Sequence, residues 1–141
     1  MKKSKILKPQ SLSSKTIKNP FEDVSPAFSF KYLIENNRNY NLESNKATDE
    51  LKCKVLHSLH NYSKRNWDDF IGNKRNTGVE RIYYSNLKKC KVHFPNNSFY
   101  NSIKDLIIFR VSNSARIVGT RIGNICYILW FDWDFSSYDH G

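Results

Sequence analysis

The feature that most constrains the fold is a pair of apolar segments joined by a two-residue turn. Residues 116–122 and 125–132 are rich in β-branched and aromatic side chains, and Gly123-Asn124 separates them. A turn of this composition is typical of two antiparallel strands that pair directly with each other. These segments therefore predict a β-hairpin.

The register of this hairpin predicts how its side chains divide between the two faces of a sheet. Gly119 lies opposite Ile128 and leaves a gap that another backbone or a ligand can approach. Alternation places three apolar side chains on each face, with Val118, Leu129 and Phe131 on one and Ile117, Ile128 and Trp130 on the other. Because both faces are apolar, we expect the sheet to be covered on one side and partly covered on the second.

Four further segments have strand character. Residues 28–33 alternate aromatic with polar side chains, which predicts a half-buried strand. Residues 79–84 and 91–94 are short strand candidates, and residues 106–111 form an apolar run that suits a central strand. Together with the hairpin, these segments predict an antiparallel sheet of about four to five strands.

One strong helical pattern covers residues 49–65. Thr48 can cap its N-terminus, and acidic residues occupy its first turn, where the helix dipole favours them. Its apolar face consists of Leu51, Val55, Leu59 and Tyr62. A short second helix is predicted from Trp67 to Ile71, ending at Gly72-Asn73. We therefore expect an α+β fold, with the sheet packed against this N-terminal helix pair.

Length and charge predict one folded domain with a basic tail. The chain has 141 residues, which suits a single domain. Residues 1–27 hold six of the 23 basic and two of the 13 acidic residues, a net charge of +4, and their composition predicts a flexible segment. The domain of residues 28–141 keeps the other +6 of the formal +10. This excess of positive charge favours RNA or another polyanion as the partner.

Several classes of protein are disfavoured by the sequence. No segment approaches a membrane span, and the basic N-terminal residues lack the apolar stretch of a secretory signal. Cys53, Cys90 and Cys126 are far apart, which argues against a zinc site and against a secreted disulfide framework. The phosphate-binding glycine loop, the nucleophile elbow and the HExxH motif are missing. We therefore expect a cytoplasmic protein that needs no metal or cofactor and no membrane.

Three arginines stand within or at the ends of otherwise apolar strands: Arg110, Arg116 and Arg121. A buried guanidinium is costly without a partner, so each must be paired, lie at a strand end or face an open groove. Two interpretations stay open. The three side chains can form a shared anion site on adjacent strands. Alternatively, each is a charge on an edge strand or makes an ion pair with Asp132, Asp134 or Glu80.

Two further groups of polar residues are candidates for contact with RNA. Tyr138 and His140 follow the last strand, and a histidine can change its charge near neutral pH, as an acid or base must. A frayed polar segment is the alternative. Lys88, Lys89 and Lys91 form a basic cluster that suits phosphate contacts, although a solvated loop explains it as well.

The order of these elements resembles the RelE/ParE superfamily of small bacterial toxins. The resemblance covers residues 28–141, with a strand, a helix pair and an antiparallel sheet that ends in arginine-rich strands. Arg110, the segment Arg116-Ile117-Val118 and the segment Tyr138-Asp139-His140 are similar to the pattern of YoeB-type members, which have an Arg in the third strand, an Arg opening the fourth and a His/Tyr pair at the end. The basic tail and the acidic stretch that begins at Asp132 depart from that pattern.

The resemblance implies a toxin that cleaves mRNA in the ribosomal A site and is neutralised by an antitoxin protein. It implies that Arg110 and Arg116 stabilise the phosphate. His140 and Tyr138 are then the acid/base pair, and Glu80 is the candidate for the catalytic acidic residue.

Three functional hypotheses follow. The first is a metal-independent mRNA endoribonuclease at the ribosome, whose RNA-binding residues are Lys88, Lys89, Lys91 and Arg121. The second is a non-catalytic, basic nucleic-acid-binding protein that acts through its tail and its lysine cluster. The third is a ParE-like toxin of gyrase, in which the surface of the helix over residues 49–65 matters most.

Overall fold

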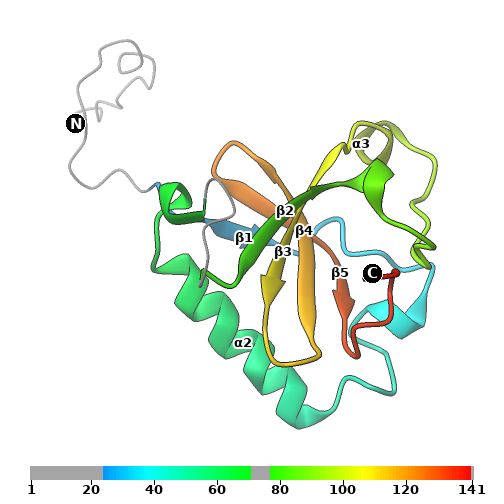
Figure 1. The fold of residues 1–141 in the computed structure, drawn as a ribbon, viewed down its shortest axis with the longest axis horizontal. Coiled ribbons are helices and arrows are strands. Elements are labelled where there is room, and N and C mark those ends of the chain that lie inside the picture. The colour runs from blue at the N-terminus through cyan, green and yellow to red at the C-terminus, as the bar shows by residue number, and fades with distance from the viewer. Residues whose placement is uncertain (1–23, 71–76, 141) are drawn as a thin grey trace, which may run out of the picture.

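The computed structural model describes residues 24–70 and 77–140, which form one five-stranded sheet with helical elements around it (Figure 1). The strands are β1 (Ala27–Ser29), β2 (Val79–Tyr83), β3 (Asp105–Arg110), β4 (Arg116–Ile122) and β5 (Ile125–Asp132). The helical elements are η1 (Arg38–Tyr40), α2 (Asp49–Ser63), η2 (Trp67–Phe70), η3 (Tyr84–Asn86) and α3 (Ser98–Asn101). The α+β class is confirmed.

The strand order in the sheet is β1-β5-β4-β3-β2. Strands β2 to β5 pair antiparallel with their sequence neighbours, as predicted. Strand β1 joins the other edge and pairs in parallel with β5, with Phe28 opposite Cys126. Because β1 precedes α2, the helices do not stand at the N-terminal end of the domain, and this detail of the prediction is corrected.

The hairpin of β4 and β5 turns at Gly123-Asn124, as predicted, with Gly123 at a φ of 65°. Gly119 pairs with Ile128, also as predicted. The gap at Gly119 is filled by the backbone of the neighbouring strand. A Cβ at this position would lie 2.8 Å from the carbonyl oxygen of Tyr127, so only glycine fits without a shift.

A β-bulge changes the predicted faces of β5. The register shifts beyond the pair formed by Gly119, and Val118 pairs with Trp130, leaving Leu129 between the pairs. Trp130 therefore joins Val118 in one core, and Phe131 joins the opposite one. The predicted grouping of Phe131 with Val118 is wrong, because alternation alone does not reveal an extra residue in one strand.

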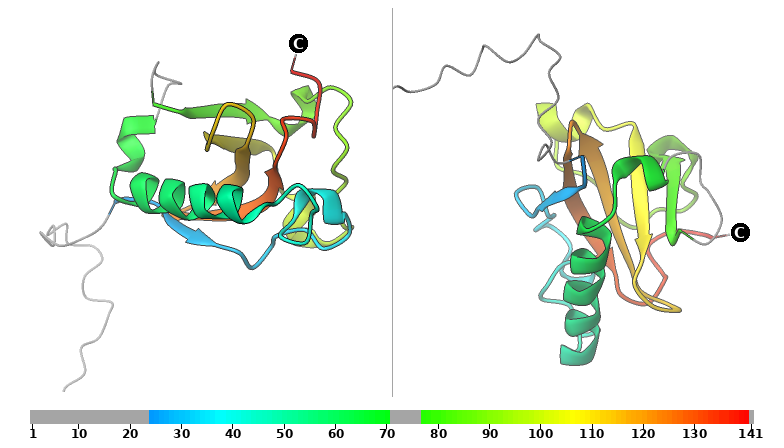
Figure 2. Two further views of the ribbon diagram at one scale, coloured as in Figure 1. Left: turned by 90° about the horizontal axis from the view of Figure 1, so that it is seen from below. Right: turned by 90° about the vertical axis from the view of Figure 1, so that its left-hand side faces the viewer.

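Both faces of the sheet are buried, and each has its own core. The first core packs α2 and η2 against one face (Figure 2), and its largest buried side chains are Tyr62, Trp67, Phe70, Phe109, Phe131 and Trp133. The second core lies on the opposite face, and it includes Ile34, Tyr40, Val92, Tyr100, Leu106, Ile108 and Trp130. The second face is covered by the turns and short helices around η1, η3 and α3, which explains why both sides of the strands are apolar.

Helix α2 confirms the predicted helix and its cap. The Oγ1 atom of Thr48 accepts a hydrogen bond from the amide of Leu51 at 3.2 Å. Val55 and Tyr62 are buried on the predicted face. The second helix is a short 3₁₀ turn, η2, and its predicted end at residues 72–73 lies outside the described residues. None of the helices in residues 24–70 and 77–140 is long and apolar enough to cross a membrane.

The strand predicted over residues 28–33 is shorter than expected. Strand β1 ends at Ser29, because the chain then turns, with the amide of Leu33 donating to the carbonyl of Phe30 at 3.1 Å. This turn delivers Ile34 into the second core, where its amide donates to the carbonyl of Leu129 at 2.9 Å.

The strand predicted over residues 91–94 is absent. Val92 is fully buried, as an apolar strand residue would be, but the backbone around it joins no sheet strand. The amide of Lys91 instead donates to the carbonyl of Ser137 at 2.7 Å. This segment therefore pairs with the residues that follow β5 and not with a strand of the sheet.

Candidate active site

Four of the charged residues in the strands share one face of the sheet. Arg110 on β3 pairs with Arg116 on β4, and Arg116 pairs with Asp132 on β5. Glu80 on β2 pairs with Ile108, which lies on the same side of β3 as Arg110. Because paired residues point to the same face, these strands bring a carboxylate, two guanidinium groups and a second carboxylate together.

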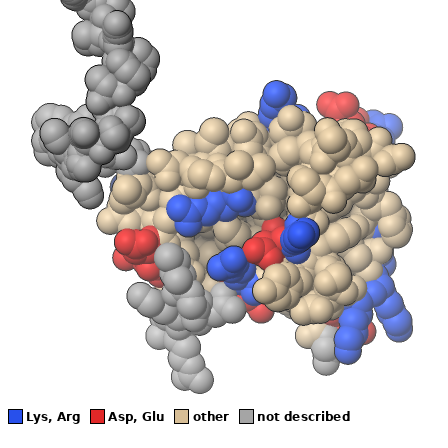
Figure 3. Space-filling model, turned by 90° about the horizontal axis from the view of Figure 1, so that it is seen from above, with Lys and Arg blue, Asp and Glu red and all other residues tan. Residues whose placement is uncertain are grey.

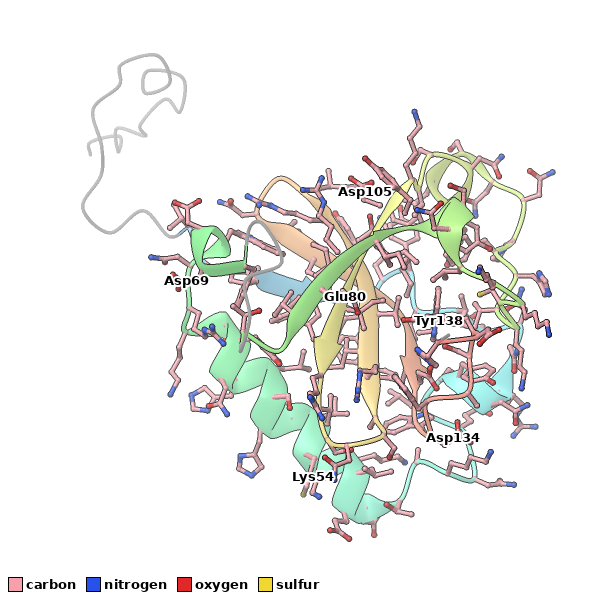
Figure 4. All side chains as sticks on the ribbon, viewed as in Figure 1. Lys54, Asp69, Glu80, Asp105, Asp134 and Tyr138 are labelled. Atoms are coloured by element: carbon pink, nitrogen blue, oxygen red, sulfur yellow. The ribbon has the colours of Figure 1, made fainter. Side chains whose placement is uncertain are left out.

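The segment after β5 folds back over this face. Figure 4 shows Tyr138, in this segment, beside Glu80 on β2, and Figure 2 shows the C-terminal residues at the level of that strand. The rings of Tyr138 and His140 lie 4.1 Å apart. The five residues predicted as catalytic, Glu80, Arg110, Arg116, Tyr138 and His140, thus come from four segments of the chain to one place.

A tyrosine of α2 fixes the strand ends that carry two of these residues. The hydroxyl of Tyr62 donates to the carbonyl of Arg110 at 2.8 Å, and it lies 3.2 Å from the carbonyl of Gly78. The amide of Arg110 donates to the same Gly78 carbonyl at 2.7 Å. Gly78 has a φ of 77°, and it immediately precedes the strand that holds Glu80. Burial of α2 against the first core therefore positions the start of β2 and the end of β3 together.

Arg116 is half-buried and held by backbone oxygens. Its Nη1 atom donates to the carbonyls of Ser112 at 2.7 Å and Ala115 at 3.0 Å. Burial lowers the pKa of its guanidinium, and the nearby charge of Arg110 lowers it further. An arginine keeps its charge at neutral pH despite such a shift. A site with two adjacent cations, one of them partly desolvated, favours an anion.

Tyr138 keeps its proton at neutral pH. Burial raises the pKa of its phenol to about 12, and the carboxylates of Glu80 and Asp132 contribute to the rise, whereas Arg116 acts in the opposite direction. At neutral pH the phenol is therefore a hydrogen-bond donor that lies near two carboxylates and one guanidinium. The raised pKa makes this phenol a weaker acid than an ordinary tyrosine, and the guanidinium of Arg116 offsets part of the rise.

The ring of Phe135 lies between Arg116 and His140. The imidazole stacks on it with ring centres 3.4 Å apart and planes 12° apart. The guanidinium carbon of Arg116 lies 4.4 Å from the centre of the same ring. The ring of Phe135 therefore contacts both side chains. Phe135 also has a positive φ of 62°, which is rare for a residue with a side chain.

The lysine cluster lies beside the segment that carries Tyr138 and His140. Lys88 forms an isolated antiparallel bridge with Asp139, whose amide donates to the carbonyl of Lys88 at 2.8 Å. The side chains of Lys88, Lys89 and Lys91 are exposed. The structure therefore places the predicted RNA-binding lysines next to the predicted catalytic residues.

Arg121 lies on the opposite face of the sheet. Its guanidinium carbon is 4.2 Å from the centre of the Trp67 ring, and its Nε atom donates to the carbonyl of Gly123 at 2.7 Å. It borders a pocket of about 140 Å³ that also contacts the ion pair of Arg81 and Asp105. Figure 3 looks onto this end of the molecule, where basic and acidic side chains lie close together. The single anion site of three arginines is therefore not formed, and RNA binding by Arg121 stays a prediction.

Sequence reasoning considered Asp132 only as a possible ion-pair partner of the arginines, and it missed Phe135. Asp132 is fully buried, and its carboxylate accepts hydrogen bonds from Ser136 and Ser137. Its position as a charged residue at the end of an apolar strand could have indicated this role from the sequence. Phe135 had no signal, because its importance depends on a backbone conformation that the residue type does not indicate.

No metal centre is formed by the part of the chain that the structure describes, where His, Cys, Asp and Glu side chains never gather in groups of three or more that could hold an ion. Cys53 is exposed, Cys90 is half-buried and Cys126 is buried, and all three are free thiols. Comparison of the chain with known proteins finds no matching family model, no matching curated protein and no matching solved structure.

Proposed function

We propose that this chain is a metal-independent endoribonuclease that cleaves mRNA, acting as a toxin of the RelE/ParE type. The observation that supports the proposal is the convergence of Arg110, Arg116, Tyr138, His140 and Glu80 on one face of the sheet. Cleavage of RNA by its own 2′-hydroxyl needs a base, an acid and a cation at the phosphate. Each of these groups is available within this set.

The proposed reaction assigns one role to each residue. His140 takes the proton of the 2′-hydroxyl, and the 2′-oxygen forms a bond to phosphorus. Arg110 and Arg116 stabilise the negative charge of the phosphorane. Tyr138 gives its proton to the 5′-oxygen as the bond from phosphorus to that oxygen breaks. The products are a 2′,3′-cyclic phosphate and a free 5′-hydroxyl, and no metal takes part.

Glu80 affects Tyr138, the proposed general acid. Its carboxylate lies close enough to raise the pKa of Tyr138, which keeps the phenol protonated until the reaction. The buried carboxylate of Asp132 lies 3.8 Å from Nε2 of His140, where it helps to orient the imidazole. Each of the two proton-transfer residues therefore has one carboxylate beside it.

The biological setting is proposed on the resemblance alone. It comprises the cytoplasm, the ribosomal A site as the place of cleavage, and an antitoxin protein that neutralises the toxin. The exposed lysines Lys88, Lys89 and Lys91 supply positive charge beside the site, as an RNA-binding enzyme requires.

The test is to express the full chain briefly in a bacterial host and to map the 5′ ends of transcripts. We expect new 5′ ends within translated frames. His140→Ala is expected to reduce their number about a hundredfold or more, because a general base contributes at least that factor. His57→Ala is the matched control, since His57 lies on the exposed side of α2.

Arg116→Ala tests the phosphate site. We expect it to reduce cleavage about a hundredfold, because it removes a preorganised cation from the transition state. Arg38→Ala is its control, since Arg38 is exposed and pairs with Glu43 at 3.0 Å. Equal loss of cleavage and of folding in the Arg116 and His140 variants contradicts the catalytic assignments. Growth arrest without new 5′ ends rejects the ribonuclease and directs attention to gyrase.

A non-catalytic nucleic-acid-binding protein is the second candidate function. It is favoured by the exposed lysine cluster and by the net charge of +10. Deletion of residues 1–23 separates the two candidates, because it removes a net charge of +4 and keeps Ala27 of β1, which pairs with Ile125 of β5. A binding protein loses most of its affinity for RNA, whereas the enzyme keeps most of its cleavage.

A further inference from the structure

Asp132 is a charged residue in a place that normally excludes charge. It is the last residue of β5, and its exposed fraction is 0%. Its Oδ1 atom accepts a hydrogen bond from the amide of Ser136 at 2.8 Å. Its Oδ2 atom accepts from the amide of Ser137 at 3.1 Å and from the hydroxyl of Ser137 at 2.6 Å. A buried carboxylate is tolerated only with such a set of donors.

The donors of Asp132 determine where the chain goes after β5. Two consecutive amides bind one carboxylate, which bends residues 133–137 back toward the sheet. Ser137 is fixed further, because its hydroxyl accepts from Nε1 of Trp130 at 3.1 Å and its carbonyl accepts from the amide of Lys91 at 2.7 Å. The segment that leads to His140 therefore starts at Ser137, which is hydrogen-bonded to Asp132, Trp130 and Lys91.

The same carboxylate lies close to the imidazole of His140. The distance from Nε2 of His140 to Oδ2 of Asp132 is 3.8 Å. The imidazole also stacks on Phe135, whose backbone has the left-handed φ of 62°. This backbone conformation is unfavourable for phenylalanine, and the hydrogen bond from Ser136 to Asp132 immediately follows it in the chain.

Phe135 extends the effect of Asp132 to Arg116. The ring that stacks on His140 also contacts the guanidinium of Arg116, with the guanidinium carbon 4.4 Å from the ring centre. Through the ring of Phe135, the bend at Asp132 thus brings His140 close to Arg116.

We infer that Asp132 is a positioning residue, whose buried carboxylate folds the segment of residues 133–140 and thereby places His140 against Phe135 and Phe135 against Arg116. The role of His140 and Arg116 in cleavage rests on the function proposed above. The placement itself does not, and it is measured on the protein without RNA.

The experiment compares Asp132→Asn with Asp134→Asn in the full chain. Asp134 is the matched control, because it is a carboxylate of the same segment that pairs with Lys46 and the hydroxyl of Ser136, whereas His140 pairs with Asp132. The first readout is the position of the His140 ring protons in the NMR spectrum. In the wild type, the Phe135 ring at 3.4 Å shifts them upfield.

For Asp132→Asn we expect these resonances to move to the positions of a histidine in a flexible peptide, while Asp134→Asn leaves them in place. The second readout is cleavage of mRNA under the same conditions. Misplacement of His140 is expected to lower kcat about a hundredfold and to leave KM nearly unchanged, because the displaced group acts on the reacting atoms. A folded Asp132→Asn protein with unshifted His140 resonances overturns the inference.

A further variant covers the case in which Asp132→Asn does not fold. Ser137→Ala removes the 2.6 Å hydrogen bond to Asp132 but keeps the charge. We expect a partial shift of the His140 resonances in the same direction, and no shift overturns the inference. If the wild type cleaves no RNA, the proposed function fails, whereas the NMR comparison still decides whether Asp132 places His140.

Discussion

At the scale of single residues, the state of the proposed acid follows from its surroundings. Burial raises the pKa of Tyr138 to about 12, and the carboxylate of Glu80 is the next cause. The phenol is half-buried, so neither water nor Arg116 stabilises its charged form enough to restore the ordinary value. A phenol with this pKa is protonated at neutral pH, and it is a weaker acid than an ordinary tyrosine.

The shifted pKa of Tyr138 predicts a loss of stability at high pH. Between the ordinary pKa of about 10 and the folded-state value of about 12, the native state binds one proton more than the unfolded state. The free energy of unfolding therefore falls as the pH rises through this window. We expect the difference in this free energy between the wild type and Tyr138→Phe, measured by urea unfolding, to be smaller at pH 11 than at pH 9.

Tyr83→Phe controls for the loss of one ionisable phenol, because Tyr83 is 60% exposed. An equal difference between the wild type and Tyr138→Phe at the two pH values contradicts the shift. Such a result means that burial and the nearby carboxylates do not change the proton affinity of Tyr138.

At the scale of elements, the hairpin of β4 and β5 depends on one close approach. A Cβ on Gly119 would lie 2.7 Å from Sγ of Cys126 and 2.8 Å from the carbonyl oxygen of Tyr127. Two of the sheet's longest strands meet here, and the neighbouring bulge decides which face Trp130 and Phe131 take. The position therefore matters to both cores.

Gly119→Ala is expected to destabilise the protein by about 3 kcal/mol, because backbone must move to relieve the contact. Gly123→Ala is the control within the same hairpin. A Cβ on Gly123 meets nothing within 4 Å, so only its φ of 65° opposes alanine. That conformational cost is about 1 kcal/mol. Urea unfolding compares the two variants, and equal costs contradict the close packing at Gly119.

The N-terminal cap of α2 is a second feature of this scale. Thr48→Ala is expected to lower the free energy of unfolding by about 1 kcal/mol, because the amide of Leu51 loses its acceptor. Thr48→Ser keeps the oxygen and is expected to keep most of the stability. Thermal unfolding of the two variants checks the prediction, and equal melting temperatures show that the oxygen of Thr48 contributes nothing.

At the scale of the whole molecule, positive charge gathers beside the candidate site. Lys88, Lys89 and Lys91 are exposed, and their backbone is joined to the segment after β5 by the bridge between Lys88 and Asp139. We expect single-stranded nucleic acid bound at the proposed site to contact these lysines. Each phosphate that they neutralise releases counterions, which makes binding dependent on salt.

Replacement of these three lysines by alanine is expected to make the plot of log affinity for RNA against log salt concentration less steep by about 2. The control replaces Lys52, Lys54 and Lys64 of α2 and its C-cap, which removes the same charge from a helix that covers the opposite face of the sheet. Fluorescence anisotropy with a labelled RNA measures both slopes. Equal slopes in the two variants reject the lysine cluster as an RNA contact.

Much of the fold and part of the candidate site could be predicted from the amino-acid sequence. The helix over residues 49–65, its Thr48 cap and the Gly123-Asn124 turn were predicted from local patterns, and the structure confirms them. The predicted catalytic residues were chosen by residue type and by resemblance. The structure brings Glu80, Arg110, Arg116, Tyr138 and His140 together, but their chemistry stays a prediction.

The sequence by itself determined what depends on neighbours in the chain: apolar periodicity, the helix cap and the glycine turn. Only the tertiary structure decided the bulge at Leu129, the parallel pairing of β1 with β5, and the bend that Asp132 imposes on the segment up to His140. Each of these is stabilised by partners that packing selects from several sterically allowed arrangements. The stabilising contacts join segments that are far apart in the sequence, so a local pattern of residues does not predict them.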